Sequence, residues 1–374
     1  MLNRVISFSF ALCILLNALL IEAHCLETEV SAESAILMNA DTGEIVFEKN
    51  IHKQRGMAST TKIMTAILAL ENVSCDRVVT AGKEDVIVEG TSIGLREGDK
   101  ITIGTLVAGM LLESGNDAAN VTAAAVGGTR EKFIGMMNEK ARELGMDNTN
   151  FVNPSGLPDE EHYSTAYDMA LLGCYAILNV DFCNICALGS MRVSYGTPEC
   201  ERTFTNHNKL LSSVEGVFGI KTGFTKSSGR CLVSAATRAG ATLVCVTLKA
   251  PDDWSDHKRL YEYGFDKLKK NEIKCSETVK IAVVGSDKKY ITANAKGNVW
   301  VCSHSSSVDI AVKVLCEPFL YSGVSAGSVV GSVRITGLFG RVLGEVPLIA
   351  TESALQNFNE REYTPSFLQR IKNF

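Results

Sequence analysis

Several common signatures are missing from this sequence, and each absence argues against a class of protein. No H-E-x-x-H motif occurs in the 374 residues, which argues against a zinc peptidase built on such a helix. The 37 lysines and arginines do not exceed the 42 acidic residues, so the net charge is −5 and we expect no nucleic-acid partner. Beyond the N-terminal segment, no second apolar run is long enough to span a membrane. With 46% hydrophobic and 21% charged residues, the chain is typical of globular proteins and long enough for two domains.

The N-terminus is expected to be a signal peptide covering residues 1–23. Arg4 supplies a positive charge, the run from Val5 to Leu20 is nearly all apolar, and Ala23 offers a small residue for cleavage. An uncleaved anchor helix is the alternative, although the run is slightly shorter than the ~20 residues that span a bilayer comfortably. We therefore expect an exported protein of the cell envelope, outside the cytoplasm.

Twelve cysteines are many for an exported chain, but they are scattered and lack the spacing of a small disulfide framework. Cys183 and Cys186 form one C-x-x-C pair without the second pair of ligands that a zinc site requires. We expect these two side chains to be buried thiols on a helix. We also expect the protein to need no metal and no other cofactor.

The spacing of apolar residues predicts an α+β domain over residues 30–272. Apolar runs on either side of Asp41-Thr42-Gly43 predict a β-hairpin near its start, and further strands are predicted near its end. Strands that flank a helical middle indicate one sheet built from both ends of the domain, with helices on its faces. The predicted helices are residues 59–72, 104–126, 130–144 and 165–178, and the later strands are residues 214–221, 230–236 and 241–248.

The composition changes after Phe265. A lysine-rich bridge at residues 267–274 leads into short runs rich in Val, Ile, Gly and Ser, which predict a small all-β domain over residues 275–350. The tail, residues 351–374, is polar and then could form a short amphipathic helix. Such a helix could contact a membrane surface or dock on the protein, and both alternatives remain open. Its apolar face would carry Phe367, Leu368, Ile371 and Phe374.

The first of three short motifs is Ser59-Thr60-Thr61-Lys62, at the start of a predicted helix. Positions i and i+3 share one helix face, so the hydroxyl and the amine can lie within hydrogen-bonding distance. A serine becomes a good nucleophile when a base takes its proton, and Lys62 can be that base only if burial or a cationic neighbour keeps it neutral. The motif alone is weak, since a second S-x-x-K occurs from Ser255 to Lys258.

The second motif is Ser114-Gly115-Asn116, in a predicted loop between two helices. A second hydroxyl near Ser59 could relay a proton to a leaving amine. The Asn116 amide has both donors and an acceptor, so it could hold the lysine and a substrate carbonyl. Taken alone, such a tripeptide is most often a turn.

The third motif is Lys221-Thr222-Gly223, at the end of a predicted strand. Gly223 allows close approach of a ligand backbone, and an extended peptide could pair with this strand edge. Lys221 and Thr222 would face the cleft and bind a carboxylate, and the charge of Lys221 would lower the pKa of Lys62. The backbone N–H of Phe224 and that of Ser59 would form an oxyanion hole.

S-x-x-K, an S-x-N motif and K-T-G occur in this order in class A β-lactamases and penicillin-binding proteins, where the middle motif often reads S-D-N. With S-G-N in the middle, the chain resembles a low-molecular-mass penicillin-binding protein of the D-alanyl-D-alanine carboxypeptidase type, peptidase family S11. The resemblance runs from about residue 34 to about residue 350. Longer segments also carry it: MASTTKIMTA, LLESGNDAAN, FVNPSGLPDEEHYSTAYDMALL, GIKTGFT and DDWSDHKRLYEYGF.

The resemblance implies a serine β-lactamase/penicillin-binding-protein-like peptidase domain followed by a small β-domain. It implies an enzyme that removes the terminal D-alanine from peptidoglycan stem peptides ending in D-Ala-D-Ala, and covalent inhibition by penicillin and other β-lactams. It implies Ser59 as nucleophile, Lys62 as base, Ser114 and Asn116 as relay and positioning residues, and Lys221 as carboxylate and proton-relay partner.

One residue of the family pattern is missing. Relatives often carry an arginine for the substrate carboxylate before K-T-G, whereas this chain reads TNHNK at residues 205–209. The role could therefore pass to Thr222, Thr225 or His207.

Other interpretations remain beside the carboxypeptidase. A β-lactamase is disfavoured because an E-x-x-L-N signature is absent between the second and third motifs. A peptidoglycan endopeptidase would use the same acyl chemistry, and a catalytically weak wall-binding protein would share the fold. Two smaller features are interpreted as structural: Asn153 to Leu157 as a turn, and His162 as a side chain packed near the cleft mouth.

Overall fold

The computed structural model describes residues 29–305 and 307–356, which form two compact units. The first unit comprises residues 29–40 and 44–268, and the second comprises residues 41–43 and 269–356. The expected signal peptide and the expected apolar helix of the tail lie outside the described residues.

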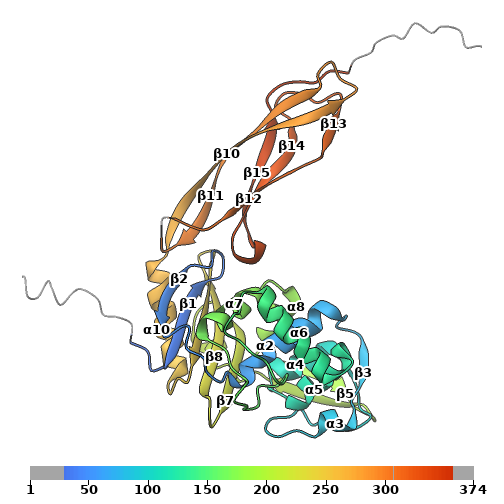
Figure 1. The fold of residues 1–374 in the computed structure, drawn as a ribbon, viewed down its shortest axis with the longest axis vertical. Helices are drawn as coiled ribbons and strands as arrows, with labels where there is room; N and C mark the ends of the chain where they lie inside the picture. The colour runs from blue at the N-terminus through green and yellow to red at the C-terminus, as the bar shows by residue number, and fades with distance from the viewer. Residues whose placement is uncertain (1–28, 306, 357–374) are drawn as a thin grey trace, which may run out of the picture. The chain divides into compact units, whose positions relative to one another are not determined.

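A five-stranded antiparallel sheet forms the core of the first unit (Figure 1). Its strand order is β2-β1-β9-β8-β7, so two strands from the start of the unit join three from its end, as the sequence predicts. Every residue of the central strand β9 and of its neighbour β1 is buried, because helices cover both faces. The strands are β1 (Ser34–Asn39), β2 (Ile45–Lys49), β7 (Val217–Thr225), β8 (Gly229–Arg238) and β9 (Ala241–Leu248).

Alternating side chains of the sheet pack against different helices. Leu243 of β9 lies in one apolar cluster with Leu260 and Tyr261 of α10 (Asp253–Lys267). The next residue, Val244, contacts Gly173 of α7 (Ala166–Ala176) on the opposite face. The unit is therefore an α+β layer structure, which confirms the predicted fold class.

The remaining helices of the first unit gather beside this sheet (Figure 1). The predicted helix at 104–126 is interrupted at residues 112–115, where the second motif forms the loop that the sequence indicates. Among the described residues no single helix could cross a membrane, and only the sharply bent pair α7 and α8 (Val180–Cys186) has the length and apolar composition together. The elements are η1 (Ala58–Thr61), α2 (Lys62–Asn72), α3 (Lys83–Val86), α4 (Ile103–Leu111), α5 (Asn116–Gly127), α6 (Arg130–Glu143), α8 (Val180–Cys186) and α9 (Leu210–Ser213), with ribbons β3 (Val78–Thr80)–β4 (Lys100–Thr102) and β5 (Ser190–Tyr195)–β6 (Cys200–Thr205).

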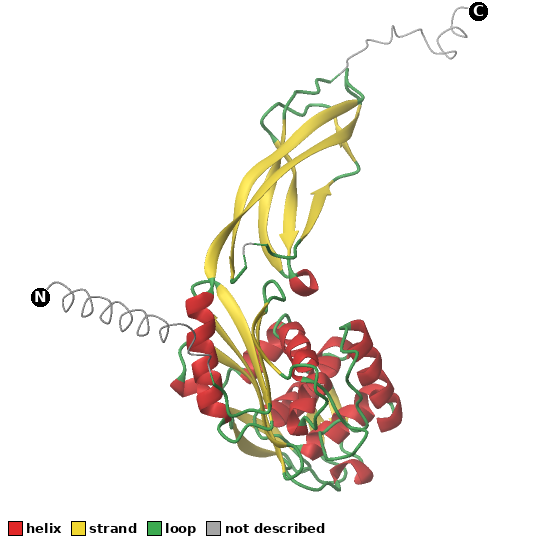
Figure 2. Ribbon diagram, turned by 60° about the vertical axis from the view of Figure 1, so that its left-hand side comes forward, coloured by secondary structure: helices red, strands yellow, loops and turns green. Residues whose placement is uncertain are grey.

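The second unit is built from strands, with one 3₁₀ turn, η2 (Leu338–Gly340) (Figure 2). The prediction of a bridge at residues 267–274 is wrong. From Lys269 onward these residues form the first part of a long strand, in which Ile273 pairs with Val299 and packs against the apolar core. The sheet has the order β12-β14-β15-β11-β10-β13. Its strands are β10 (Lys269–Val284), β11 (Tyr290–Ser303), β12 (Ala311–Cys316), β13 (Phe319–Tyr321), β14 (Val329–Thr336) and β15 (Val342–Ala350).

Candidate active site

Ser59 lies in the 3₁₀ turn η1, which continues directly into helix α2. The preceding residue, Ala58, has a left-handed backbone with φ of 48°. Its carbonyl oxygen would lie 1.9 Å from a Cβ atom placed on Gly156, so only glycine fits opposite it. This close backbone contact fixes the chain immediately before Ser59.

The side chain of Lys62 is fully buried, and its amine reaches three oxygens. Nζ lies 2.9 Å from Ser59 Oγ, 2.7 Å from Asn116 Oδ1 and 2.6 Å from the backbone oxygen of Ser155. The Asn116 amide is oriented because its Nδ2 donates to the backbone oxygen of Glu89 at 2.6 Å. A neutral amine would donate to the two carbonyl oxygens and direct its lone pair at the Ser59 hydroxyl.

The surroundings of Lys62 favour this neutral form. Burial lowers the pKa of Lys62 well below its ordinary value, and the positive charge of Lys221 lowers it further. Asp117 acts in the opposite direction, but its carboxylate already accepts the backbone N–H groups of Ile93 and Leu95 at 2.9 and 3.0 Å. The arrangement can therefore supply a base to a serine hydroxyl.

Ser114 lies in the turn that joins α4 to α5, and Asn116 is the first residue of α5. Ser114 has a φ of 64°, and its carbonyl oxygen accepts the Thr91 hydroxyl at 2.6 Å. The backbone N–H of Asn116 donates to the Thr91 oxygen at 2.8 Å, so the segment around Thr91 holds both ends of the motif. This places the Ser114 side chain on the same cavity as Ser59.

The third motif lies on β7, the edge strand beside η1. A Cβ atom on Gly223 would lie 3.0 Å from the backbone nitrogen of Ser59, so glycine allows the strand to approach the turn. Lys221 differs from expectation: it is 1% exposed, does not line the cavity, and donates to the Thr222 oxygen at 3.0 Å. Burial lowers the pKa of Lys221 to about 7.

A cavity of about 410 Å³ collects most of the predicted site. Lys62 and Lys221 are buried outside its lining. Thr225 and His207, two candidates for binding a carboxylate, line it as well. The predicted site residues in its wall are Ser59, Ser114, Asn116, Thr222, Gly223 and Phe224.

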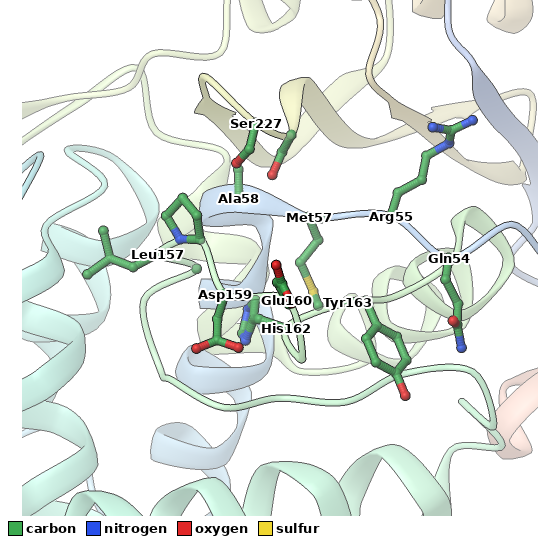
Figure 3. A pocket seen from close by; sticks show the side chains of 14 residues that line it. Gln54, Arg55, Met57, Ala58, Leu157, Asp159, Glu160, His162, Tyr163 and Ser227 are labelled. Carbon is green, nitrogen blue, oxygen red and sulfur yellow. The ribbon is translucent and has the colours of Figure 1, made fainter.

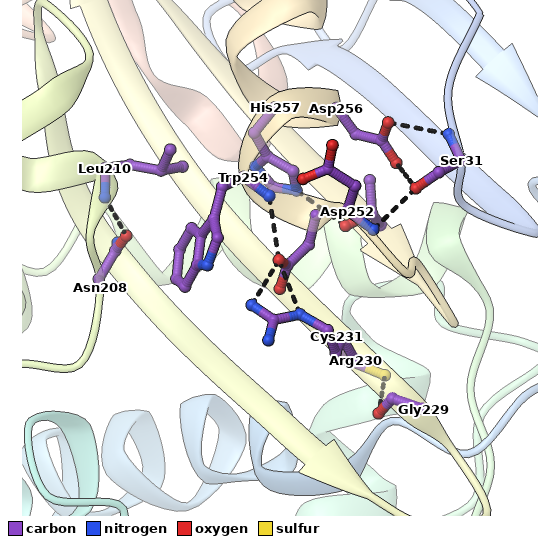
Figure 4. A network of polar contacts seen from close by, with 12 residues as sticks. Ser31, Asn208, Leu210, Gly229, Arg230, Cys231, Asp252, Trp254, Asp256 and His257 are labelled. Carbon is purple, nitrogen blue, oxygen red and sulfur yellow. Dashed lines mark hydrogen bonds and ion pairs between the residues drawn. The ribbon is translucent and has the colours of Figure 1, made fainter.

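Sequence reasoning missed Arg230, which lines the cavity from β8 directly opposite Phe224 in the ladder. Its Nε and Nη2 donate to Asp253 Oδ1 at 2.9 and 2.7 Å, and its guanidinium carbon lies 5.5 Å from the centre of the Trp254 ring (Figure 4). The side chain is still 40% exposed, so donors remain for a ligand. The sequence signal that could have identified this residue is an arginine shortly after K-T-G, just past the turn that ends the strand.

The segment from Asn153 to Leu157 forms the predicted turn and also contacts Lys62. Asn153 Oδ1 accepts the backbone N–H of Gly156 at 2.7 Å, as in a turn, but the Ser155 oxygen also accepts from Lys62. His162 is 3% exposed, and its Nε2 lies 2.8 Å from the Thr61 hydroxyl. Because its Nδ1 accepts a backbone N–H and burial lowers its pKa to about 4, His162 is neutral near pH 7.

The described part of the chain gives little support to a metal site, a cysteine site or a different catalytic serine. No cluster of three or more His, Cys, Asp or Glu side chains there could hold a metal ion. Cys183 and Cys186 lie on helix α8, where Cys186 is buried and Cys183 is partly buried. The Ser234 hydroxyl lies 2.7 Å from His257 Nδ1, but both side chains are completely buried, so no substrate can reach that pair.

Comparisons with known proteins agree with this geometry. A family model described as D-alanyl-D-alanine carboxypeptidase, peptidase S11, matches residues 21–252. The carboxypeptidase DacC of Escherichia coli is 33% identical over 349 residues, which cover 87% of this chain and 84% of that protein. DacF of Bacillus subtilis is 28% identical over 335 residues, covering 86% and 85%.

Solved structures show the same fold. The carboxypeptidase DacD from Francisella tularensis superposes with a TM-score of 0.60 at 28% identity, covering 88% of this chain and 95% of that one. The DD-transpeptidase of Streptomyces K15 gives a TM-score of 0.61 at 33% identity, covering 64% and 98%. These neighbours confirm the expected penicillin-binding-protein-like fold.

Proposed function

Because the chain belongs to the D-alanyl-D-alanine carboxypeptidase family, peptidase S11, we propose that it is a serine-type carboxypeptidase acting through an acyl-enzyme on Ser59. Its substrate is a peptidoglycan stem peptide that ends in D-Ala-D-Ala, and β-lactams acylate the same serine. The observation that carries the proposal is the buried Lys62 amine, held between two carbonyl acceptors and 2.9 Å from the Ser59 hydroxyl.

The substrate binds as an extended strand along the free edge of β7. Its terminal carboxylate lies near Thr222, with the cationic groups of Arg230 and, when protonated, His207 on the same cavity. The penultimate carbonyl then points its oxygen at the backbone N–H groups of Ser59 and Phe224. Lys221, which is buried and donates to the Thr222 oxygen, contributes positive charge when it is protonated, and with a pKa of about 7 it is only partly protonated near pH 7.

Acylation then proceeds by general base catalysis. Neutral Lys62 takes the Ser59 proton as Oγ bonds to the penultimate carbonyl carbon. The carbon–nitrogen bond breaks, and the proton passes from Lys62 through the Ser114 hydroxyl to the leaving amine of D-alanine. Water attacks the ester while giving a proton to Lys62, which returns it to Ser59 as the ester bond breaks.

The test uses the chain without residues 1–23. Penicillin should add one adduct to the intact mass of the wild type and none to Ser59→Ala, and the wild type should release D-alanine from a D-Ala-D-Ala peptide. An adduct without release would favour the endopeptidase or the wall-binding alternative. No adduct on folded protein would contradict the acyl-enzyme mechanism.

Export to the cell envelope is part of the same proposal. It is supported by the charged and apolar pattern of residues 1–23 and by a substrate that lies outside the cytoplasm. Contact of the C-terminal tail with the membrane surface is proposed on the apolar face that residues 367–374 would form. Fractionation of cells that express the full chain and a chain ending at residue 356 would test both points.

A further inference from the structure

Asp117 is a buried carboxylate that directly follows the second motif, and the acylation steps do not use it. It lies in the first turn of α5 and is 1% exposed. Its Oδ1 accepts the backbone N–H of Ile93 at 2.9 Å, and its Oδ2 accepts that of Leu95 at 3.0 Å. Within the described residues it forms no ion pair with a lysine or an arginine. Since a buried charge without a cation is costly, the backbone donors and the N-terminal end of α5 stabilise it.

The glycine of the second motif leaves the space that this carboxylate occupies. A Cβ atom on Gly115 would lie 2.9 Å from Asp117 Oδ1 and 2.9 Å from Ile93 Cγ2. Both distances are shorter than real Cβ contacts, so a larger residue at position 115 would push the carboxylate or Ile93 aside. The S-G-N form of the motif therefore fits together with an aspartate at position 117.

The N–H groups that Asp117 accepts belong to a largely exposed loop, residues 89–95, which is neither helix nor strand. On one side of this loop, Thr91 lines the catalytic cavity and its oxygen accepts the backbone N–H of Asn116. The Glu89 oxygen accepts Asn116 Nδ2. On the other side, Asp117 fastens the loop to α5. The loop is thus held between two consecutive residues of α5.

The Asn116 amide connects this loop to the catalytic base. Its Nδ2 is held by the loop, and its Oδ1 accepts Lys62 Nζ at 2.7 Å. A shift of the loop would turn the amide and move the Lys62 amine relative to the Ser59 hydroxyl. Small displacements of a catalytic group are costly for the rate, so the place of the loop matters for acylation.

Asp117 also acts on the charge of the base. Burial lowers the pKa of Lys62, and Lys221 lowers it further when it is protonated, whereas Asp117 raises it. Asp117 therefore limits the fall in the pKa of Lys62, and a lysine that is neutral but still basic accepts a proton more readily.

The other titratable groups near Lys62 and Asp117 are uncharged near pH 7. His162 lies beside Asp159 in the neighbouring cavity (Figure 3), and its pKa of about 4 keeps it neutral. Tyr195 donates its hydroxyl to the Ile93 oxygen, and burial raises its pKa to about 12. A change of charge at position 117 therefore acts on Lys62 beside Lys221 alone.

We propose that Asp117 is a positioning residue of the acylation reaction. Its carboxylate clamps the loop of residues 89–95 to α5, holds the Asn116 amide in place, and so keeps the Lys62 amine directed at Ser59. This inference rests on the proposed function, because it assigns a role within the same acylation step.

Asp117→Asn tests the clamp, because asparagine keeps the shape but loses the charge and one of the two acceptor oxygens. The rate constant for acylation at saturating penicillin should fall by about 10–100-fold, the cost of a slightly misplaced base. The penicillin concentration that gives half of this rate should stay within about threefold of wild type, because the lost contact is not a binding contact. The low-pH limb of the acylation rate should move to lower pH, since the anion that raises the pKa of Lys62 is gone.

Asp168→Asn is the matched control. Asp168 is also 1% exposed, lies in the first turn of α7 and accepts the backbone N–H of Asn148 at 2.9 Å, away from the cavity. It should acylate at the wild-type rate, with the limb unmoved, at a temperature where circular dichroism shows both variants folded.

Thr91→Val separates the clamp from the charge and serves if Asp117→Asn does not fold. It removes the hydroxyl that donates to the Ser114 oxygen at the cavity end of the loop. Acylation should slow about three- to tenfold, the size of one hydrogen bond, while the limb stays in place because no charge changes.

Three results would overturn the inference while the carboxypeptidase activity stands. They are a wild-type acylation rate in Asp117→Asn or in Thr91→Val, an equal loss in Asp168→Asn, and a limb that does not move in Asp117→Asn, as a merely structural carboxylate would give. Absence of a penicillin adduct and of D-alanine release in the wild type would instead contradict the proposed function.

Discussion

The two units of the chain bury different kinds of side chain. Between residues 44 and 268 the interior holds ionisable groups, among them Lys62, Lys221 and Asp117. In the described residues from 269 to 356, Ser303 is the buried polar side chain, and the core is made of alternating apolar residues of the strands. Burial of a charge is strongly unfavourable, and it lowers the pKa of Lys62 and of Lys221, as a catalytic site can require. Buried lysines therefore mark the working part of this molecule.

Replacing the buried base should have the largest effect. Lys62→Met keeps an unbranched apolar stem in the same space but removes the amine that faces Ser59. Penicillin acylation should slow by about 10²–10⁴-fold, the usual contribution of a general base. The measurement is the growth of the adduct by intact mass over time.

The second S-x-x-K copy provides the control. Lys258 is exposed on α10, three residues after Ser255, so Lys258→Met should acylate at the wild-type rate. Equal acylation by Lys62→Met and wild type would remove Lys62 from the role of base.

A core substitution in each unit tests whether the two interiors act separately. Leu348→Ala removes a fully buried side chain of the second unit, and Leu243→Ala does so in the first. Each should lower the stability of its own unit by about 2–5 kcal/mol. Scanning calorimetry should show a different transition shifted in each variant.

Of the two substitutions, only Leu243→Ala in the first unit should affect the active site. Leu348→Ala should acylate within twofold of wild type at a temperature where both units are folded. A tenfold loss in Leu348→Ala would show that the second unit takes part in the chemistry.

Arg230 contrasts with the buried lysines because it is a partly exposed cation that lines the cavity. Arg230→Gln should raise KM for a D-Ala-D-Ala peptide by about 10-fold or more, as expected when a charged hydrogen bond to a carboxylate is lost. A peptide ending in an amide should lose much less. Arg238→Gln, on the same strand but with its Nε on the Glu215 oxygen, should leave KM unchanged. Equal effects on both peptides would contradict a role in carboxylate binding.

The sequence predicted more of the fold than of the site's finer geometry. Apolar periodicity located the hairpin, the late strands and the β-unit, because these elements are defined by local pattern. The three motifs named Ser59, Lys62 and Ser114, but the Ser155 carbonyl and Arg230 were missed. A backbone oxygen carries no side-chain signal, and Arg230 reaches the cavity only through pairing of β8 with β7. Burial of Lys221 likewise depends on tertiary packing.

The smallest expected effect is on stability at alkaline pH. The pKa of Lys221 is about 7 in the folded chain and 10.5 ordinarily, so between these values the unfolded chain holds a proton that the folded chain lacks. Raising the pH removes this advantage of the unfolded state, and stability rises.

From pH 7 to 8.5 the melting temperature of the first unit should increase by about 2–4 °C more in wild type than in Lys221→Met. Lys226→Met, an exposed neighbour in the turn after β7, should behave as wild type. Burial raises the pKa of the Cys231 thiol from its ordinary value of 9.0 to about 11. This shift lowers the stability only above pH 9.0, which lies beyond the pH range of the measurement. An equal rise in wild type and Lys221→Met would show that Lys221 is not held neutral by burial, and the contrast between the two interiors would then rest on Lys62 alone.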